Sequence, residues 1–556
     1  MSMREPLVGD YPIPDETHRV AHAAFPKGNR YLQLREHFGM LFDNRRFLHL
    51  FAHAGKPALS PARLALVTIL QFMEGVGDQQ AADNVRDRIS WKYLLGLPLD
   101  DPGFDASVLS EFRLRLVQDD VAALLLDGVL DLCRDAGLLK ERGKQRTDST
   151  YVLAAIRELH RLENVGETLR HALNRLAVVA PTWLCTRVDP VWGERYATRI
   201  TQYRLPKDEH ARQQLAVTIG QDGYQLLTAA YAPDAPLAVR REPAVDALRC
   251  LWVQHYDRCT DPQAPVVRWR TAEEQPPTAQ LITSPYDLEA RCKTKRETTW
   301  VGYSVHLTET CDDDTPNLIT QVTTMPASAD DHTALAPIQA DLAARELLPA
   351  EHYVDSGYID AQALVESKRE HQITLVGPVQ ADGSWQARTP NGITSAQFVL
   401  DWEAQQAICP AGAVSQLWQV SRDKGGNAAI TVRFGRGDCV PCELRATCTK
   451  GQAHGRQLML RPQEQHLALQ TARAWQETEE FKADYARRAG VEGSFTQANR
   501  RSDLRHARYI GLAKTHVQNV ITAVAINLLR VLAWLAEVPR ATTRTSPFAR
   551  LMATSP

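Results

Sequence analysis

Residues 298–310 read TTWVGYSVHLTET, a run rich in β-branched and aromatic residues that predicts a β-strand. A second such run, NLITQVTTMPA, occupies residues 317–327, and a helical pattern follows it. Farther along, the strand-like segments EHYVDSGY (351–358) and ITLVGPV (373–379) flank a predicted helix at 361–371. Strands and helices that alternate in this way predict an α/β fold, in which a sheet is layered with helices.

The chain before this sheet is mostly helical. Residues 61–117 carry apolar stripes separated by glycine and proline turns, a pattern that fits a helix-turn-helix-like DNA-binding bundle and a plain helical bundle equally well. The segment KQRTDSTYVLAA (144–155) predicts a short strand, with Asp148 within it or at its end. A long helix-rich stretch then continues to about residue 255.

The bulk composition is that of a globular protein. The chain has 556 residues, with 44% hydrophobic and 23% charged residues, which excludes a disordered or collagen-like chain. A formal net charge of -2 neither requires nor excludes a polyanionic partner, because binding depends on where charges cluster. The N-terminal residues contain no apolar signal segment, so we expect a cytoplasmic protein. Residues 517–536 approach membrane-spanning length but include Arg530, which favours a buried helix.

Two aspartates stand in similar local settings. Asp148 in RTDST and Asp355 in YVDSGY each come at or near the end of a strand-like run and precede a small hydroxyl residue. The ends of strands commonly present catalytic groups, because a rigid sheet fixes the side chain while the adjoining loop leaves it reachable. Taken singly, an aspartate in such a place more often forms a turn or caps a helix.

A third acidic residue lies in a basic segment. The stretch YARRAGVEGSFTQANRR, residues 485–501, holds one glutamate, Glu492, among four arginines. On a helix, Tyr485, Arg488 and Glu492 share one face. Residues 485–516 contain seven Lys or Arg and two acids, a balance that suits the phosphate backbone of a nucleic acid.

A solvated salt bridge between Arg488 and Glu492 is the alternative interpretation of this segment. Gly490 and Gly493 argue mildly against it, because each glycine costs about 0.5–1 kcal/mol in a helix that serves only as a scaffold. The glycines instead suggest close packing or close approach of another backbone.

The order of these motifs resembles that of the DDE transposases of bacterial insertion sequences. The matching motifs are TDST, VDSGY and then Y-x2-R-x3-E at Tyr485, Arg488 and Glu492, and the resemblance extends from about residue 60 to about residue 540. It implies an RNase H-like mixed sheet flanked by helices, with Asp148, Asp355 and Glu492 as the catalytic residues and metal ligands. Three carboxylates suit Mg²⁺ or Mn²⁺, and two such ions roughly 3.5–4 Å apart activate the nucleophile and stabilise the leaving oxygen.

The resemblance also implies double-stranded DNA as the partner, both the terminal inverted repeats of the element and the target. Arg488 would contact DNA or balance the acidic cluster. Many relatives carry Lys or Arg seven residues after the glutamate, whereas this chain has Asn499 there and Arg500 next. Pairing of two ends implies a homodimer in the synaptic complex. The resemblance also implies a bacterial, nucleoid-associated protein without a membrane role. The expected DNA-binding residues are Tyr485, Arg488, Arg500, Arg501 and Arg505.

Long intervals separate the three acidic residues, so each interval must contain an insertion. The catalytic core would then be assembled from three separate stretches of the chain. The expected organisation is an N-terminal segment (1–50), a helical DNA-binding domain (51–140), the catalytic core (141–160, 291–380 and 481–540), a helical insertion (161–290), a Cys-rich insertion (381–480) and a C-terminal tail (541–556).

Four of the ten cysteines are grouped in the segments CPAG and CVPCELRATC. Cys409, Cys439, Cys442 and Cys448 resemble the ligands of a structural Zn²⁺ site, in which four thiolates surround the ion. Buried free thiols are the alternative, because the gap between the first two cysteines is irregular. Neither interpretation is catalytic, because a catalytic zinc ion keeps one open position.

Two other polar positions have ordinary structural explanations. His306, on the strand at 298–310, is more simply a hydrogen-bonded sheet histidine than a group at the metal site. Asp330 and Asp331 begin a predicted helix and are expected to cap it.

The leading hypothesis is therefore a DNA transposase that cleaves the ends of its element and joins them to target DNA. The alternatives are a DNA-binding protein with an inactive transposase core and a nuclease of the same fold that cuts without joining. The chain contains no P-loop, G-x-S-x-G or H-E-x-x-H motif, which argues against ATP-driven, serine-hydrolase and zincin chemistry.

Overall fold

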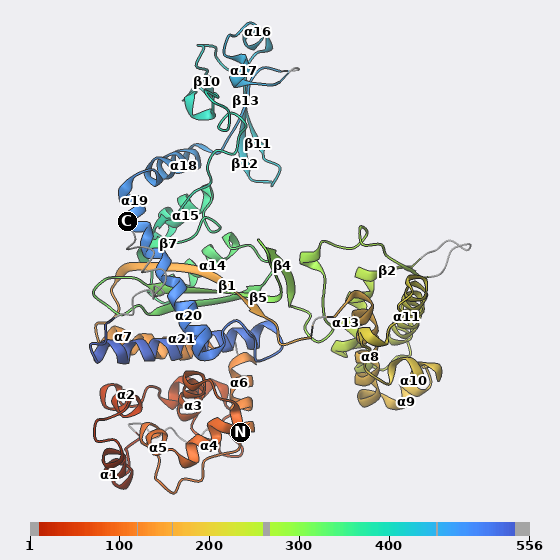
Figure 1. The fold of residues 1–556 in the computed structure, drawn as a ribbon, viewed down its shortest axis with the longest axis vertical. Helices are drawn as coiled ribbons and strands as arrows, with labels where there is room; N and C mark the ends of the chain where they lie inside the picture. Colours follow the sequence, from red (N-terminus) through yellow and green to blue (C-terminus); the bar gives the residue numbers. More distant parts are fainter. Residues whose placement is uncertain (1–10, 119–120, 158, 259–266, 452–453, 540–556) are drawn as a thin grey trace, which may run out of the picture.

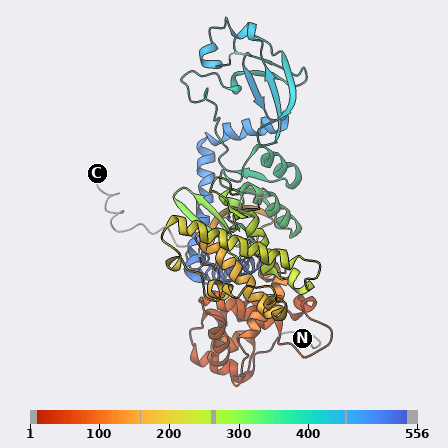
Figure 2. The same ribbon diagram turned by 90° about the vertical axis from the view of Figure 1, so that its right-hand side faces the viewer.

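The computed structural model describes residues 11–118, 121–157, 159–258, 267–451 and 454–539. Cys259 and the predicted C-terminal tail lie outside the described residues. The chain forms a central sheet with its helices, a group of N-terminal helices and two lobes that project from the centre (Figure 1). Turned by 90°, the molecule shows the N-terminal helices and one of these lobes at opposite ends (Figure 2).

One mixed sheet lies at the centre. In space its strands follow the order β4-β5-β1-β7-β8, and β6 pairs with the part of β5 that β4 leaves free. Strand β1 pairs antiparallel with β5 and parallel with β7, which pairs parallel with β8. The α/β prediction is confirmed, and the sheet is compatible with an RNase H-like core. The strands are β1 (Arg142–Leu153), β4 (Arg291–Lys295), β5 (Thr298–Thr310), β6 (Ile319–Pro326), β7 (Pro349–Tyr353) and β8 (Thr374–Val376).

Helices cover the sheet on both sides (Figure 1). Along β5, Tyr303, Val305 and Leu307 are buried in one apolar cluster with α21, because alternate side chains of a strand point to the same face. Helices α14 and α15 pack with the ends of β7 and β8 in a second cluster. The helices concerned are α7 (Ala123–Asp135), α14 (His332–Ala344), α15 (Ala361–His371), α20 (Val491–Ser502) and α21 (Leu512–Leu535).

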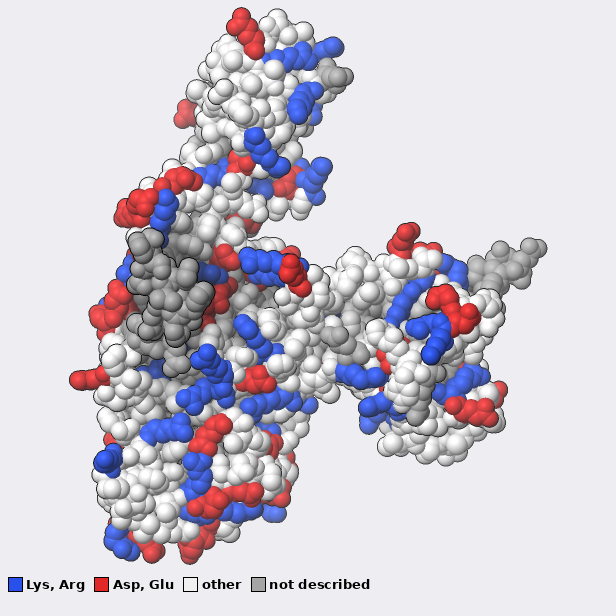
Figure 3. Space-filling view, in the orientation of Figure 1, with Lys and Arg blue, Asp and Glu red and all other residues white. Residues whose placement is uncertain are grey.

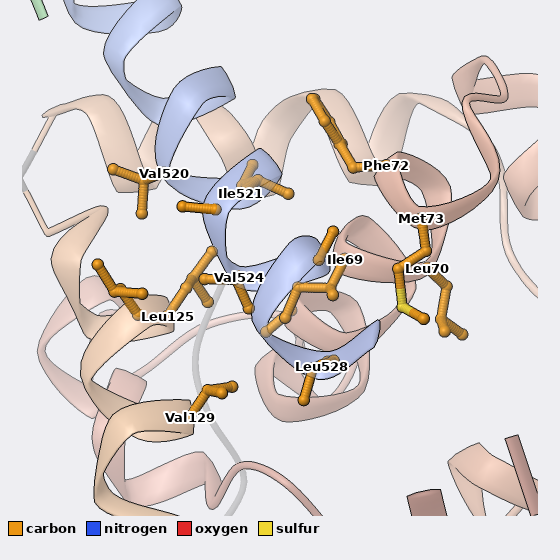
Figure 4. Packing of buried hydrophobic residues seen from close by; sticks show 14 of the residues in the cluster. Ile69, Leu70, Phe72, Met73, Leu125, Val129, Val520, Ile521, Val524 and Leu528 are labelled. Atoms are coloured by element: carbon orange, nitrogen blue, oxygen red, sulfur yellow. The ribbon is translucent and has the colours of Figure 1, made fainter. Parts of the chain in front are cut away.

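Helix α21 is the central apolar element of the fold. Among the described residues it is the one helix long and apolar enough to cross a membrane by length and composition, yet 78% of its most apolar window is buried inside the protein. Figure 4 shows Val520, Ile521, Val524 and Leu528 of this helix between α3 and α7. The buried position predicted for residues 517–536 is confirmed.

The N-terminal helices pack against α21 and share its apolar cluster. Helix α3 begins where the Ser60 side chain accepts a hydrogen bond from the Arg63 amide and Pro61 takes the first position, and it ends at Gly75 in the left-handed conformation. The three residues 75–77 then lead into α4, a short turn of the kind found in helix-turn-helix units. The helices are α1 (Asp15–Ala24), α2 (Arg30–Phe38), η1 (Asn44–Leu50), α3 (Pro61–Glu74), α4 (Asp78–Asp87), α5 (Ile89–Leu95) and α6 (Ser107–Gln118).

A helical lobe projects sideways from the centre (Figure 1). In the chain it is inserted between β1 and β4. It has an apolar core of its own, with Trp252 and Tyr256 fully buried. The lobe contains α8 (Arg161–Val179), α9 (Pro181–Cys185), α10 (Val191–Tyr196), η2 (Gln202–Arg204), α11 (Glu209–Ala230), α12 (Leu237–Arg240), α13 (Pro243–His255), β2 (Tyr256–Arg258), β3 (Val267–Trp269) and η3 (Thr278–Gln280).

A second lobe, called here the outer lobe and comprising residues 393–460, lies at the far end of the molecule (Figures 1 and 2). It consists of two small sheets and very short helices: η4 (Ser395–Gln397), β9 (Val399–Asp401), β10 (Gln406–Ile408), β11 (Leu417–Arg422), β12 (Ala428–Arg433), α16 (Arg436–Cys439), α17 (Arg445–Cys448) and β13 (Gln457–Leu460). The chain returns to the sheet through α18 (Gln463–Gln476), α19 (Glu479–Tyr485) and η5 (Ala486–Gly490). The predicted domain boundaries remain predictions.

Candidate active site

The pairing of β1 with β7 brings two aspartates together. The parallel register ends with Arg146 opposite Tyr353. Asp148 and Asp355 each lie two residues beyond this pair, so both strands direct them to the same face of the sheet at neighbouring positions. Asp148 is 6% exposed, whereas Asp355 is more open to solvent. Each carboxylate accepts a hydrogen bond of 2.8 Å from the next amide, that of Ser149 or Ser356.

A guanidinium group lies between the two carboxylates. Arg488 forms an ion pair with Asp148, and its Nη2 is 3.8 Å from Oδ2 of Asp355. Burial raises the pKa of Asp148 to about 6, although Arg488 acts in the opposite direction. Glu492 and Asp355 contribute to the rise, which places Glu492 within electrostatic range of Asp148. The three predicted carboxylates therefore belong to one region of the molecule.

The segment that carries Arg488 and Glu492 differs from the single helix on which Tyr485, Arg488 and Glu492 were expected to share one face. Helix α19 ends at Tyr485, a 3-10 turn spans Ala486–Gly490, and α20 begins at Val491. Glu492 is exposed in the first turn of α20. The tighter turn holds Arg488 against the aspartates, and the Tyr485 ring stacks on Phe481 with centroids 5.4 Å apart.

A buried group of charges, called here the Glu309 network, fixes α20 against the sheet. Glu309 on β5 has no exposed surface. Its carboxylate accepts a hydrogen bond of 2.8 Å from Nε of Arg146 on β1 and one of 2.7 Å from Nη1 of Arg530 on α21. Ser494 on α20 donates its hydroxyl to the same carboxylate at 2.5 Å. Arg146 lies two residues before Asp148 and Ser494 two residues after Glu492. The network therefore ties together the elements that carry the first and third acidic residues.

Two family models match the chain. The model of the transposase DDE domain matches residues 408–532, which include Arg488 and Glu492, and that of the transposase domain (DUF772) matches residues 19–115 in the N-terminal helices. These two matches support the assignment of the chain to the DDE transposases of insertion sequences. No curated protein matches it. Asp148 and Asp355 lie outside both matched segments, so their roles in this transposase rest on the geometry of the sheet.

Two side chains that were predicted to have ordinary structural roles lie close to Ser149, the residue after Asp148. Asp331 does not cap α14 with its side chain, contrary to expectation. Its Oδ1 instead accepts the hydroxyl of Ser149 at 3.2 Å, and Lys295 lies 3.5 Å away. The predicted sheet role of His306 is confirmed: its Nδ1 lies 2.6 Å from the Tyr358 hydroxyl, and burial lowers its pKa to about 4. The hydrogen bond from Ser149, the residue after Asp148, shows that Asp331 borders the site.

The predicted DNA-binding arginines have different surroundings. Arg500 and Arg501 are exposed at the end of α20. Arg505 is partly buried, with its guanidinium 4.9 Å from the centre of the Tyr151 ring, so it packs against β1. On the face of the molecule in Figure 3, basic and acidic side chains are interspersed among the described residues. Arg500 and Arg501 are therefore the more accessible candidates for DNA contact.

The carboxylates match the chemistry of a hard divalent ion, because all their donor atoms are oxygens. Within the described ranges, however, no three His, Cys, Asp or Glu side chains are placed so that they could hold an ion without moving. Arg488 takes the position of a cation between Asp148 and Asp355. An ion that binds both aspartates must displace this guanidinium.

One of the two glycines beside Glu492 is explained by packing. A methyl group on Gly490 would overlap the guanidinium of Arg146, whose Nη1 donates to the Arg487 carbonyl at 2.6 Å. Arg146 cannot move aside freely, because Glu309 also holds it. A methyl group on Gly493 would meet nothing within 4 Å. The close packing inferred from sequence therefore applies to Gly490.

Exchanging each glycine for alanine tests this difference. We expect Gly490→Ala to destabilise the transposase by about 1–3 kcal/mol, because an overpacked side chain must push Arg146 out of the Glu309 network. Gly493→Ala should be neutral or stabilise by up to about 1 kcal/mol, since alanine favours a helix. Chemical denaturation followed by circular dichroism measures both, and equal stabilities would contradict the packing argument.

Proposed function

We propose that this transposase hydrolyses phosphodiester bonds at the ends of its element in a metal-dependent reaction and joins the freed 3′ ends to target DNA. The observation that supports the proposal is the register of β1 and β7, which sets Asp148 beside Asp355 under Arg488. Glu492 on the following helix adds the third carboxylate.

Asp148 and Asp355 would hold the divalent ions, with Glu492 completing one coordination shell or orienting the attacking water. When bound, such ions activate a water oxygen and stabilise the developing charge on the leaving oxygen. In hydrolysis the water oxygen bonds to phosphorus and loses a proton, while the bond to the 3′ oxygen breaks and that oxygen gains one. In joining, the 3′ hydroxyl takes the place of the water.

Arg488 has two successive roles in this proposal. Without DNA and metal it offsets part of the negative charge of the two aspartates, since its side chain is 18% exposed and lies against both. With the aspartates engaged by divalent ions, the Arg488 guanidinium would be free to bind a phosphate oxygen of the DNA beside the reacting bond. Tyr485, at the end of α19, would flank the same strand.

The N-terminal helices and the end of α20 would bind the element ends. Exposed Gln79 and Gln80 on α4 and exposed Arg500 and Arg501 on α20 are of types that contact bases and phosphates. Because two ends must be cut and joined together, we expect two transposase chains in the synaptic complex.

A labelled element end separates this function from its alternatives. The full chain is incubated with the labelled terminal repeat and an unlabelled target, with Mg²⁺ or with chelator. We expect metal-dependent cleavage followed by joined product. Specific binding without metal-dependent cleavage would indicate a DNA-binding protein with an inactive core, and cleavage without joining would indicate a nuclease.

A further inference from the structure

Four free cysteines face one cavity in the outer lobe. Cys409 follows β10, Cys439 and Cys448 end α16 and α17, and Cys442 lies between these two helices. All four line a cavity of about 490 Å³ together with apolar residues such as Ile393 and Phe434. Two small sheets adjoin this cavity: β9 and β10 precede Cys409, and β12 and β13 bracket the other three thiols.

Backbone amides are directed at two of the sulfurs. The amide of Ala413 donates to Sγ of Cys409 at 3.3 Å, in a turn where Gly412 has a φ of +84°. The amide of Arg456 donates to Sγ of Cys439 at 3.4 Å. A Cβ on Gly455 would lie 2.8 Å from the same sulfur, so glycine is needed there. Hydrogen bonds of this kind stabilise the negative charge of metal-bound ligands and fix their orientation.

A buried cation lies beside the thiols. Arg456 is 9% exposed and lines the same cavity, and its Nη1 donates to the Cys448 carbonyl at 2.9 Å. Its Nε is a buried donor without a hydrogen-bond partner among the described residues. Four thiolates around a divalent ion leave two excess negative charges, and an adjacent guanidinium offsets part of them. Asp382 also acts on the Arg456 guanidinium, so metal-bound thiolates would be a second source of negative charge near it.

We propose that Cys409, Cys439, Cys442 and Cys448 bind one zinc ion that fastens the two small sheets of the outer lobe to each other. Four sulfur ligands suit zinc in tetrahedral coordination. The thiols are not close enough as they stand to hold an ion, so binding draws the turn after β10 toward the α16–α17 segment and contracts the cavity. The apolar core of this lobe is small, eight buried residues, which is the situation in which a metal stabilises a fold.

The metal content of the purified full chain tests the proposal. We expect about one zinc ion per chain by mass spectrometry, and cobalt substitution should give the intense visible absorption of tetrahedral thiolate coordination. Cys442→Ala should lower zinc occupancy at limiting metal by at least about tenfold, whereas Cys442→His should retain most of it, because histidine is also a zinc ligand. Cys185→Ser, at an exposed thiol of the helical lobe, is the matched control and should bind zinc like the wild type.

Limited proteolysis supplies a readout that does not depend on transposition. Chelation should speed cleavage within residues 393–460 and leave the helical lobe and the N-terminal helices as resistant as before. Wild-type protein that binds no zinc when zinc is supplied would overturn the proposal. Cys442→Ala and Cys409→Ala variants that bind as much zinc as the wild type would overturn it too.

Discussion

Replacing Asp148 with asparagine is expected to reduce metal-dependent cleavage of element-end DNA by on the order of 10³-fold or more, because the site loses a charged metal ligand where charge develops in the reaction. Asp355→Asn and Glu492→Gln should act in the same direction. Binding of the same DNA should stay close to that of the wild type, since most DNA contacts are expected from the N-terminal helices and the end of α20 rather than from Asp148. Rate measurements at saturating Mg²⁺, together with gel-shift titrations, separate the two effects.

The stability of Asp148→Asn provides a check that does not depend on catalysis. Because burial raises the pKa of Asp148 to about 6, its contribution to stability is fully present below the unfolded pKa and is lost as pH rises through 6. Asparagine does not ionise, so the free energy of unfolding of the variant relative to wild type should increase between pH 4 and pH 7 in metal-free buffer. Asp135→Asn, at an exposed position on α7, is the matched control variant.

These experiments test whether Asp148, Asp355 and Glu492 are the catalytic residues. They do not test whether the chain is a transposase. Wild-type rates of cleavage in both Asp148→Asn and Glu492→Gln would refute the assigned triad while leaving the chain a transposase. A variant that neither binds DNA nor melts cooperatively would have lost its fold, and Glu492→Gln, at an exposed position, is the substitution least able to cause this.

Local patterns were sufficient to predict much of the core. Residues 298–310 form β5 and residues 361–371 form α15 with the predicted bounds, because the residue types within each segment favour that element; β5, rich in β-branched and aromatic residues, is buried along most of its length. The strand around Asp148 has the length of the predicted run, twelve residues, but begins and ends two residues earlier, and β5 pairs along most of it. Pairing between distant segments sets where an element begins and ends.

The surroundings of the site depend on contacts that no local pattern encodes. Asp148 and Asp355 were predicted to converge, but the position of Arg488 between them follows from the register of β1 and β7 and from the 3-10 turn before α20. Glu309 lies in the segment that predicts β5, where it is one polar residue among several. Its role becomes visible only when Arg530, 221 residues away, reaches it from α21.

Substitution of Glu309 is the second change with a large expected effect. Glu309→Ala should destabilise the transposase by about 3–5 kcal/mol, because Arg146 and Arg530 would remain buried without their counter-charge. The control is Glu351→Ala, which removes the partly exposed ion-pair partner of Lys144. Lys144, like Arg146, lies on β1, and this variant should lose no more than about 1 kcal/mol of stability. Equilibrium denaturation in urea compares the two, and similar losses would show that the Glu309 network is not a main support of the fold.

The pH dependence of the Glu309 variants distinguishes loss of charge from loss of packing. Burial acts to raise the pKa of Glu309, but Arg530 and Arg146 outweigh it and hold that pKa below its ordinary value. Its contribution to stability is therefore present above the unfolded pKa and lost as pH falls. Glu309→Gln keeps the shape of the side chain, so its deficit relative to wild type should be large at pH 7 and shrink toward pH 3. A deficit that stays constant over this range would mean that the Glu309 carboxyl has the same pKa in the folded and the unfolded protein. In that case the network could not hold α20, and with it Glu492, against β1 by charge.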